Sequence, residues 1–342
     1  MYRSSRLLIT GILGLAFLFS SQSLFAVHPP WGIATDIEGN IYFPDLTHHS
    51  RGALWKIDKK GKLILLEEDF HAHNVVTDKF GNVYSSHGEA DQYFIRFSPK
   101  GKKDTLVHKD NFNDFFGGNC TITKDGKIVF GIENKIWTLD NQGNRVPYTD
   151  FEFSWNQALF ADEEGNLFAT DIKRHNGSIV KIPKNGKPEI VAENLISSKP
   201  EERNLHNDVL LGMGKDEAGE LYVAETAGKQ ILKVKAGEKP STFYKSEDEW
   251  TPTAITFRDG VAYILESHES NAKGPKITII QNGKKPKTLF DFPNYFKDAW
   301  TQMQSQSYQL RNSFWVGMFL LPLLLASLIF MITKSIHRAG IY

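Results

Sequence analysis

Apolar and polar residues alternate along most of this 342-residue chain, in short runs that end at glycine turns. Runs such as Ile-Tyr-Phe at 41–43 and Leu-Trp-Lys-Ile-Asp at 54–58 show the two-residue period of a half-buried β-strand. The glycines between the runs allow the positive φ that tight hairpin turns require. The pattern therefore predicts an all-β fold built from many short strands.

These strands recur as a repeat that occurs six times. The glycine turns that open the second strand of each repeat are 42, 45, 39, 54 and 41 residues apart, at Gly39, Gly81, Gly126, Gly165, Gly219 and Gly260. A period of about 40 to 45 residues with four short strands is typical of a β-propeller. We therefore predict a six-bladed β-propeller over residues 27–292. Because neither end offers a spare strand, we expect the ring to close by packing of the first blade against the last.

The N-terminal end does not follow the repeat. Arg3 and Arg6 precede an apolar run at 7–19, and small and polar residues follow up to Ala26. This order of positive charge, apolar core and small residues is that of a secretory signal peptide. We therefore predict a signal peptide at 1–26.

The C-terminal end predicts a membrane anchor. Residues 314–333 contain no charged side chain, and twenty helical residues span a bilayer core of about 30 Å. Lys334 and Arg338 follow, which places the tail at 334–342 in the cytoplasm and the propeller on the periplasmic or extracellular side. The Gln- and Ser-rich stretch at 293–313 is predicted to be a juxtamembrane helix or linker. The protein is thus expected to cross an inner or plasma membrane once.

The net charge and the cysteine count each argue against one possibility, a nucleic-acid partner and an intramolecular disulfide. Forty basic and forty acidic residues give a formal net charge of zero, which argues against nucleic acid as a partner. Cys120 is the single cysteine, so an intramolecular disulfide is excluded. Its position on a predicted inner strand indicates a small buried apolar residue.

Candidate site residues gather on one predicted face. Propeller strands alternate in direction, so inner strands begin where second strands end; we call this side the top face. The 54-residue spacing also predicts an insertion at 197–210 above it. The candidate ligand-binding residues there are Trp31, Asn74, Gln157, His206, Asn207 and His268.

Oxygen-bearing side chains on the same face suit a hard cation. Calcium takes six to eight oxygen ligands from carboxylates and amides. His73 and His87, in one blade, are candidate general bases beside such an ion. In the alternative interpretation, the acids bond turn amides and the histidines are structural. The candidate metal ligands are Asn119, Asn156, Glu133, Asp171 and Glu225.

Two segments resemble a known family of repeats. Residues 32–45 and the run Val-Val-Thr-Asp-Lys-Phe-Gly-Asn-Val-Tyr at 75–84 are similar to NHL repeats and to the related gluconolactonase, regucalcin and paraoxonase propellers. The resemblance covers about residues 31–292. In the hydrolases of this group it implies an axial calcium ion, with Asn119 and Asn156 at the positions of the axial Asn ligands. The usual Ser-Asn-Gly-Leu context is replaced here by Trp-Asn-Gln-Ala at 155–158.

Two functions remain open at this point. The first is a membrane-anchored, extracytoplasmic propeller that binds a protein, peptide, glycan or small molecule on its top face. The second is a calcium-dependent hydrolase of lactones or esters. The altered motif at 155–158, together with Pro-Trp-Gly at 30–32 in place of the early Gly-Glu-Gly-Pro, favours the binding protein.

Overall fold

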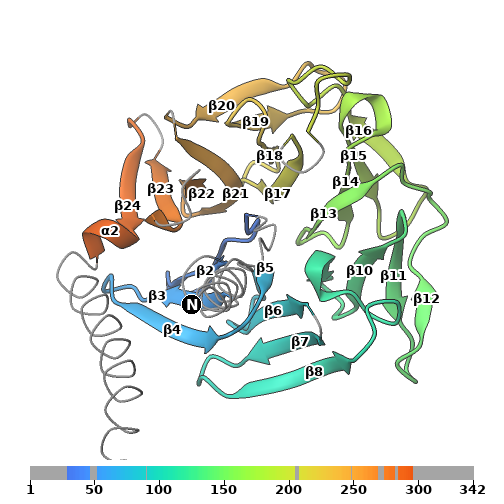
Figure 1. The fold of residues 1–342 in the computed structure, drawn as a ribbon, viewed down its shortest axis with the longest axis horizontal. Helices are drawn as coiled ribbons and strands as arrows, with labels where there is room; N and C mark the ends of the chain where they lie inside the picture. The colour runs from blue at the N-terminus through green and yellow to red at the C-terminus, as the bar shows by residue number, and fades with distance from the viewer. Residues whose placement is uncertain are drawn as a thin grey trace, which may run out of the picture.

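The computed structural model describes residues 29–46, 52–89, 91–204, 208–247, 249–268, 273–281 and 284–295. Within them, strands β1 to β24 form six four-stranded antiparallel sheets arranged around a central axis (Figure 1). The predicted all-β, six-bladed propeller is confirmed.

Each blade consists of four consecutive strands, numbered outward from the axis. The first three blades are β1 (Ala34–Thr35), β2 (Ile41–Asp45), β3 (Ala53–Ile57) and β4 (Leu63–Glu68); β5 (Ala72–Thr77), β6 (Val83–Gly88), β7 (Gln92–Phe97) and β8 (Lys103–Lys109); and β9 (Cys120–Ile122), β10 (Ile128–Ile132), β11 (Lys135–Leu139) and β12 (Arg145–Pro147). The last three are β13 (Asn156–Ala161), β14 (Leu167–Asp171), β15 (Ser178–Ile182) and β16 (Glu189–Ala192); β17 (Leu210–Lys215), β18 (Leu221–Glu225), β19 (Gln230–Val234) and β20 (Ser241–Lys245); and β21 (Trp250–Arg258), β22 (Val261–His268), β23 (Lys276–Gln281) and β24 (Lys287–Asp291). Short helices are η1 (Gly117–Asn119), η2 (Arg174–Asn176) and α2 (Phe292–Tyr295).

A shared aspartate turn explains why the repeat folds as it does. Between β1 and β2, Gly39 has a φ of 84°, and Asp36 Oδ1 accepts backbone N–H groups of Glu38 and Asn40 at 2.9 and 3.0 Å. The hydroxyl of Tyr42 donates to Asp36 Oδ2 at 2.7 Å. Aspartates with the same bond from the i+4 backbone N–H recur at Asp78, Asp162 and Asp216. Each turn therefore satisfies its own amides at the bottom of its blade.

The turns also shift the pKa values of their aspartate and tyrosine side chains. Burial opposes ionisation of Asp36, but hydrogen bonds from Asn40 and Tyr42 outweigh it and lower the pKa of the carboxyl. The same balance lowers the pKa of Asp78. Burial, and then the hydrogen bond to Asp36, raise the pKa of Tyr42. The folded turn therefore favours an ionised aspartate beside a neutral tyrosine.

The hydrophobic core lies between blades. Between blades two and three, for example, Phe115 and Phe130 meet edge to face with centroids 4.9 Å apart, and Tyr84 and Phe94 pack in the same cluster. The aromatic side chains of one blade thus fill the face of the next. Cys120 belongs to this cluster, and burial raises the pKa of its thiol, so its interpretation as a buried apolar residue is confirmed.

Aromatic packing closes the ring, as expected. Phe43 of the first blade lies 5.6 Å from Phe290 of the last and 6.3 Å from Phe292, measured between ring centroids. The Leu63 backbone N–H donates to the Tyr295 hydroxyl at 2.8 Å. In the described part of the chain, every sheet contains only its own four consecutive strands, and none is exchanged between the first and last blades.

The predicted terminal segments are not part of this description. The signal peptide at 1–26, the span at 314–333 and the tail at 334–342 lie outside the described residues, as does the segment at 296–313. Among the residues that are described, no helix is long and apolar enough to cross a bilayer.

Candidate functional site

A cavity of about 540 Å³ opens on the top face, where the inner strands of blades two, three and four begin. Its wall comes from β5, η1, the β10–β11 turn and the start of β13, and β5 and β13 are inner strands beside the axis in Figure 1. Six of the predicted site residues line it: Trp31, His73, Asn119, Glu133, Asn156 and Gln157.

Trp31 and His73 form one wall. Their rings stack with centroids 4.4 Å apart and planes within 4° of parallel. The Trp31 backbone N–H donates to His73 O at 2.8 Å, and His73 Nδ1 lies 3.1 Å from Gly118 O. Both side chains are buried, so this stack presents a fixed surface to the cavity.

Two asparagines meet at the axial side of the cavity. The Asn119 amide N–H donates to Asn156 Oδ1 at 2.9 Å. Gly131 makes the pair possible, because a Cβ there would lie 2.0 Å from Asn156 Oδ1 and 2.5 Å from Asn119 Nδ2. Asn119 Oδ1 is buried and accepts no hydrogen bond from any described residue.

Glu133 is at the tip of the shortest top-face turn. Ile132 pairs with Lys135, so only Glu133 and Asn134 connect β10 to β11. Both have positive φ, 53° and 62°, as a type I′ turn requires. The Glu133 side chain is exposed at the cavity, and it is the single acid among the cavity-lining residues of the described structure.

Asp171 points into its own blade. It is fully buried and accepts the backbone N–H groups of Ser154 and Trp155 at 2.8 and 2.9 Å. Arg174 Nε donates to its Oδ2 at 2.9 Å. Asp171 thus fixes the strand entry that carries Trp155.

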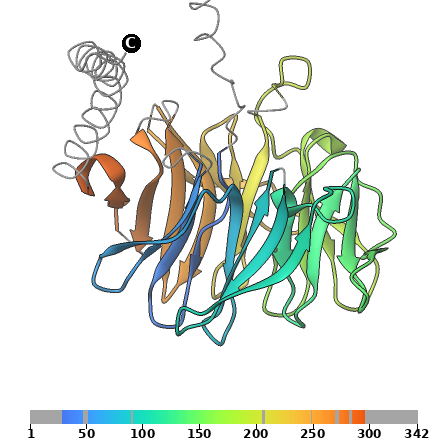
Figure 2. The ribbon, with the colours of Figure 1, turned by 60° about the horizontal axis from the view of Figure 1, so that its bottom comes forward.

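Glu225 is likewise fully buried within blade five. It accepts N–H groups from Ser197 at 3.1 Å and from Gly228 at 3.0 Å, and the Gln230 amide at 3.0 Å. Ser197 belongs to the predicted insertion in the connection between β16 and β17, and its described part at 197–204 projects above the blades in Figure 2. Arg203 in the same insertion donates to Ser198 O at 3.1 Å.

The predicted calcium ligands are therefore split between two environments. Asn119, Asn156 and Glu133 line the cavity, whereas Asp171 and Glu225 bond their own blades. The cavity offers fewer carboxylates than calcium sites usually have. Metal analysis of the purified protein, with thermal melts before and after EDTA, is the direct test of the calcium hypothesis.

The other predicted residues lie away from the cavity or outside the described ranges. His87 Nδ1 accepts the His71 backbone N–H at 2.8 Å. Asn74 Nδ2 donates to Cys120 O at 3.1 Å, and His268 Nε2 lies 2.8 Å from Glu249 Oε2. His206 and Asn207 fall in an undescribed gap of the insertion.

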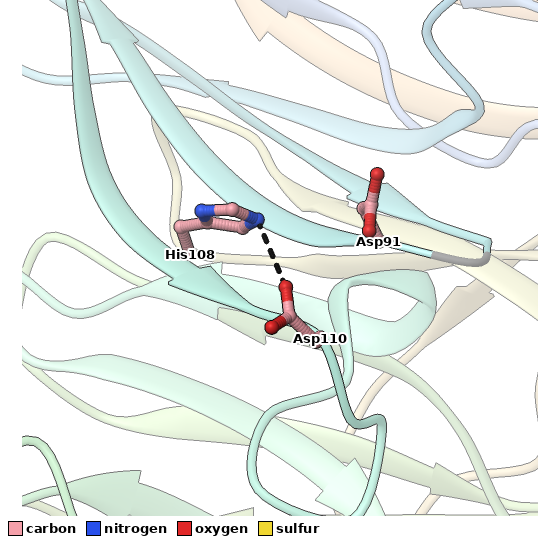
Figure 3. Close-up of side chains that lie close together, drawn as sticks. All are labelled: Asp91, His108 and Asp110. Atoms are coloured by element: carbon pink, nitrogen blue, oxygen red, sulfur yellow. Dashed lines mark ion pairs between the residues drawn. The ribbon is translucent and has the colours of Figure 1, made fainter.

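A separate surface grouping was not expected from the sequence. Asp91, His108 and Asp110 bring three potential ligand atoms within 4.8 Å of one another at the outer strands of blade two (Figure 3). His108 Nε2 lies 3.4 Å from Asp110 Oδ1, and its ring stacks on Tyr93. All three side chains are exposed, and it is the one such His, Cys, Asp and Glu grouping in the described structure.

Several cavity residues were missed by the sequence analysis: Phe112, Phe116, Asn134 and Trp155. Phe112 and Phe116 lie in the connection between β8 and β9, and the length of such connections varies from blade to blade. The position of this connection before an inner strand places it on the top face, so its aromatic residues were the available signal. Phe112 is 57% exposed, which is unusual for so large an apolar side chain.

Comparisons with known proteins agree on the fold. No family model matches the chain, and no curated protein matches it. A streptogramin B lyase structure has a TM-score of 0.52 at 18% identity over 76% of this chain and 82% of that one. This chain therefore has the same fold as the streptogramin B lyase structure. The agreement confirms, at the level of the fold, the resemblance indicated by the repeats.

Two further structures give similar values. A virginiamycin B lyase from Staphylococcus aureus has a TM-score of 0.50 at 17% identity, over 76% of this chain and 84% of that chain. A structure described as a putative gluconolactonase has a TM-score of 0.50 at 14% identity, over 77% and 92%. At such low identities the similarity establishes the architecture alone.

Proposed function

We propose that this chain is a propeller that binds a small molecule in the top-face cavity between Trp31 and Trp155. The observation that carries the proposal is the cavity itself. Its volume of about 540 Å³ falls within the usual range for small-molecule sites, about 300–1,000 Å³. A protein or glycan partner would more naturally use an extended surface.

The chemistry of the wall supports a small-molecule ligand. Four aromatic rings supply apolar surface, and four amide side chains supply hydrogen-bonding groups, which is the usual mixture in ligand sites. The aromatic residues are Trp31, Phe112, Phe116 and Trp155, and the amide residues are Asn119, Asn134, Asn156 and Gln157. Inner-strand ends hold Trp31, Trp155 and Asn156 in place, so this part of the site needs little ordering on binding.

Location forms a separate part of the proposal. The predicted signal peptide at 1–26 and the predicted span at 314–333 support a propeller that is anchored in an inner or plasma membrane. The cavity would then face the periplasmic or extracellular side. Protease protection of the full chain in sealed membrane vesicles of known orientation tests this placement.

Binding is tested with two matched tryptophans. A fragment library is screened against the full chain by ligand-observed NMR, and hits are retested on Trp155→Ala and Trp250→Ala. Both tryptophans are half-buried and carry a lysine Nζ 4.4 Å from the ring centroid, but only Trp155 lines the cavity. We expect hits that survive Trp250→Ala and are lost in Trp155→Ala. Hits that respond equally to both substitutions would contradict the proposal.

A further inference from the structure

The cavity has a distinct electrostatic character, because one carboxylate and no lysine or arginine lines its described wall. That carboxylate is Glu133, whose side chain makes no hydrogen bond or ion pair with any described residue. Three acids at or near the top ends of other second strands, Asp171, Glu225 and Glu266, are fully buried and bonded within their own corners of the top face. Glu133 is thus available to a ligand where the other acids are not.

The backbone at Glu133 strengthens this distinction. A glutamate with a φ of 53° is uncommon, because turns of this type favour glycine, asparagine or aspartate at that position. Glu133 therefore occupies a position that local conformational preference does not explain. Such residues are often retained for a functional reason.

Aromatic rings around the carboxylate favour a cationic group. The faces of indole and phenyl rings attract ammonium ions, and tryptophan attracts them most strongly. The cavity wall supplies such rings from Trp31, Phe112, Phe116 and Trp155.

Asn119 adds a requirement for a hydrogen-bond donor. Its side chain is 5% exposed, it lines the cavity, and its Oδ1 accepts no hydrogen bond from the described residues. A buried acceptor without a donor costs free energy, so a donor on the ligand would stabilise the complex. A protonated primary amine offers N–H donors, whereas a quaternary ammonium does not.

We propose that the cavity binds a primary amine in its protonated form, carried on an apolar or aromatic body. The amine faces Glu133 and the Asn119 amide oxygen, and the body packs among the aromatic rings. This inference rests on the proposed small-molecule function and adds the chemical class of the ligand to it.

The test compares three probes of one shape and different charge. The full chain is titrated at neutral pH with 2-phenylethylamine, 2-phenylethanol and 3-phenylpropanoate by ligand-observed NMR. We expect the amine to bind about tenfold more tightly than the alcohol, the size of one good charge-assisted hydrogen bond. Glu133→Gln should remove most of this preference. The control is Glu163→Gln, because Glu163 is an exposed acid away from the cavity. This variant should keep the preference for the amine over the alcohol.

The outcomes separate the ligand class from the general function. If amine and alcohol bind equally and both are lost in Trp155→Ala, the amine proposal is overturned and the cavity remains the binding site. If no probe binds, or the amine preference survives Glu133→Gln, the amine proposal is overturned as well. If probes bind but none responds to Trp155→Ala, both proposals are contradicted.

Discussion

The top-face corners of blades three and six use their acids in opposite ways. In blade six, Glu266 is fully buried, accepts a bond from Ser246 Oγ at 2.6 Å, and lies 3.3 Å from Lys276 Nζ. In blade three, Glu133 is exposed at the end of a two-residue turn and bonds no described residue. The first acid stabilises the propeller, and the second is left for a ligand.

The difference follows from the length of the local chain. Blade six reaches Glu266 with long strands of nine and eight residues, β21 and β22, and side chains of β20 and β23 surround the carboxylate. In blade three only two residues connect β10 to β11, so Glu133 lies beyond the end of the sheet. Glu133 lies one residue beyond the repeat position of Glu266, which Ile132 occupies in blade three.

The largest effect is expected from removing the buried acid. Glu266→Ala leaves Lys276, whose side chain is 12% exposed, without its carboxylate, together with the hydroxyls of Tyr244 and Ser246. Breaking a buried ion pair from one side costs about 3–5 kcal/mol. We expect a loss of that size in urea unfolding. Glu133→Ala is the control and should stay within about 0.5 kcal/mol of wild type; equal losses would remove the contrast between the corners.

A smaller loss, with a functional consequence, is expected at Gly131. The Cβ of Gly131→Ala would displace the Asn119–Asn156 pair, an overpacking that costs about 1–3 kcal/mol. We expect lower stability in urea unfolding and weaker binding of cavity ligands. In an Asn156→Ala background the same substitution should cost less, because one clashing side chain is gone. Strict additivity of the two losses would argue against this packing.

Lowering the pH should test the aspartate turns at the bottom of the blades, which recur at Asp36, Asp78, Asp162 and Asp216. The pKa of Asp78 is lowered in the folded state, so its contribution to stability is complete above its unfolded value, near 3.8, and is lost as pH falls through the folded pKa. Asp78→Asn should therefore flatten the fall in unfolding free energy between about pH 5 and pH 2. An unchanged slope in urea unfolding across this range would exclude a role for Asp78 in acid sensitivity.

The smallest effect is expected from a single hydroxyl in the same turn. Tyr84→Phe removes the donor that lies 3.0 Å from Asp78 Oδ2 and should cost about 0.5–1.5 kcal/mol. Tyr222→Phe is the equivalent change in blade five, because the Tyr222 hydroxyl donates to Asp216 Oδ2 at 2.9 Å. Similar losses in urea unfolding are expected from both, and a loss in only one would show that the turns are not equivalent.

The sequence was informative where the chain repeats itself. Regular glycine turns and alternating strands were enough to predict six blades, the common top face and closure by packing, because these features are local or follow from the period. The burial of Asp171 and Glu225 was not predictable, since their partners Arg174 and Ser197 come from connections that no other blade shares. The sequence left a structural and a metal-binding role open for them, with the structural role favoured.

The cavity residues, too, could be predicted from the sequence only where they follow the repeat. Trp31, Asn119 and Asn156 were identified because they start inner strands at repeated positions. Phe112 and Phe116 were missed because connections such as the one between β8 and β9 vary in length from blade to blade. Binding residues concentrate in such irregular connections, since these can change without disturbing the blades.

A crystal structure of the protein with the tightest hit of the fragment screen tests the central claim most directly. The account predicts electron density for the ligand in the top-face cavity, between Trp31 and Trp155 and within hydrogen-bonding distance of Glu133. Density in another part of the propeller, with this cavity holding only solvent, would contradict it.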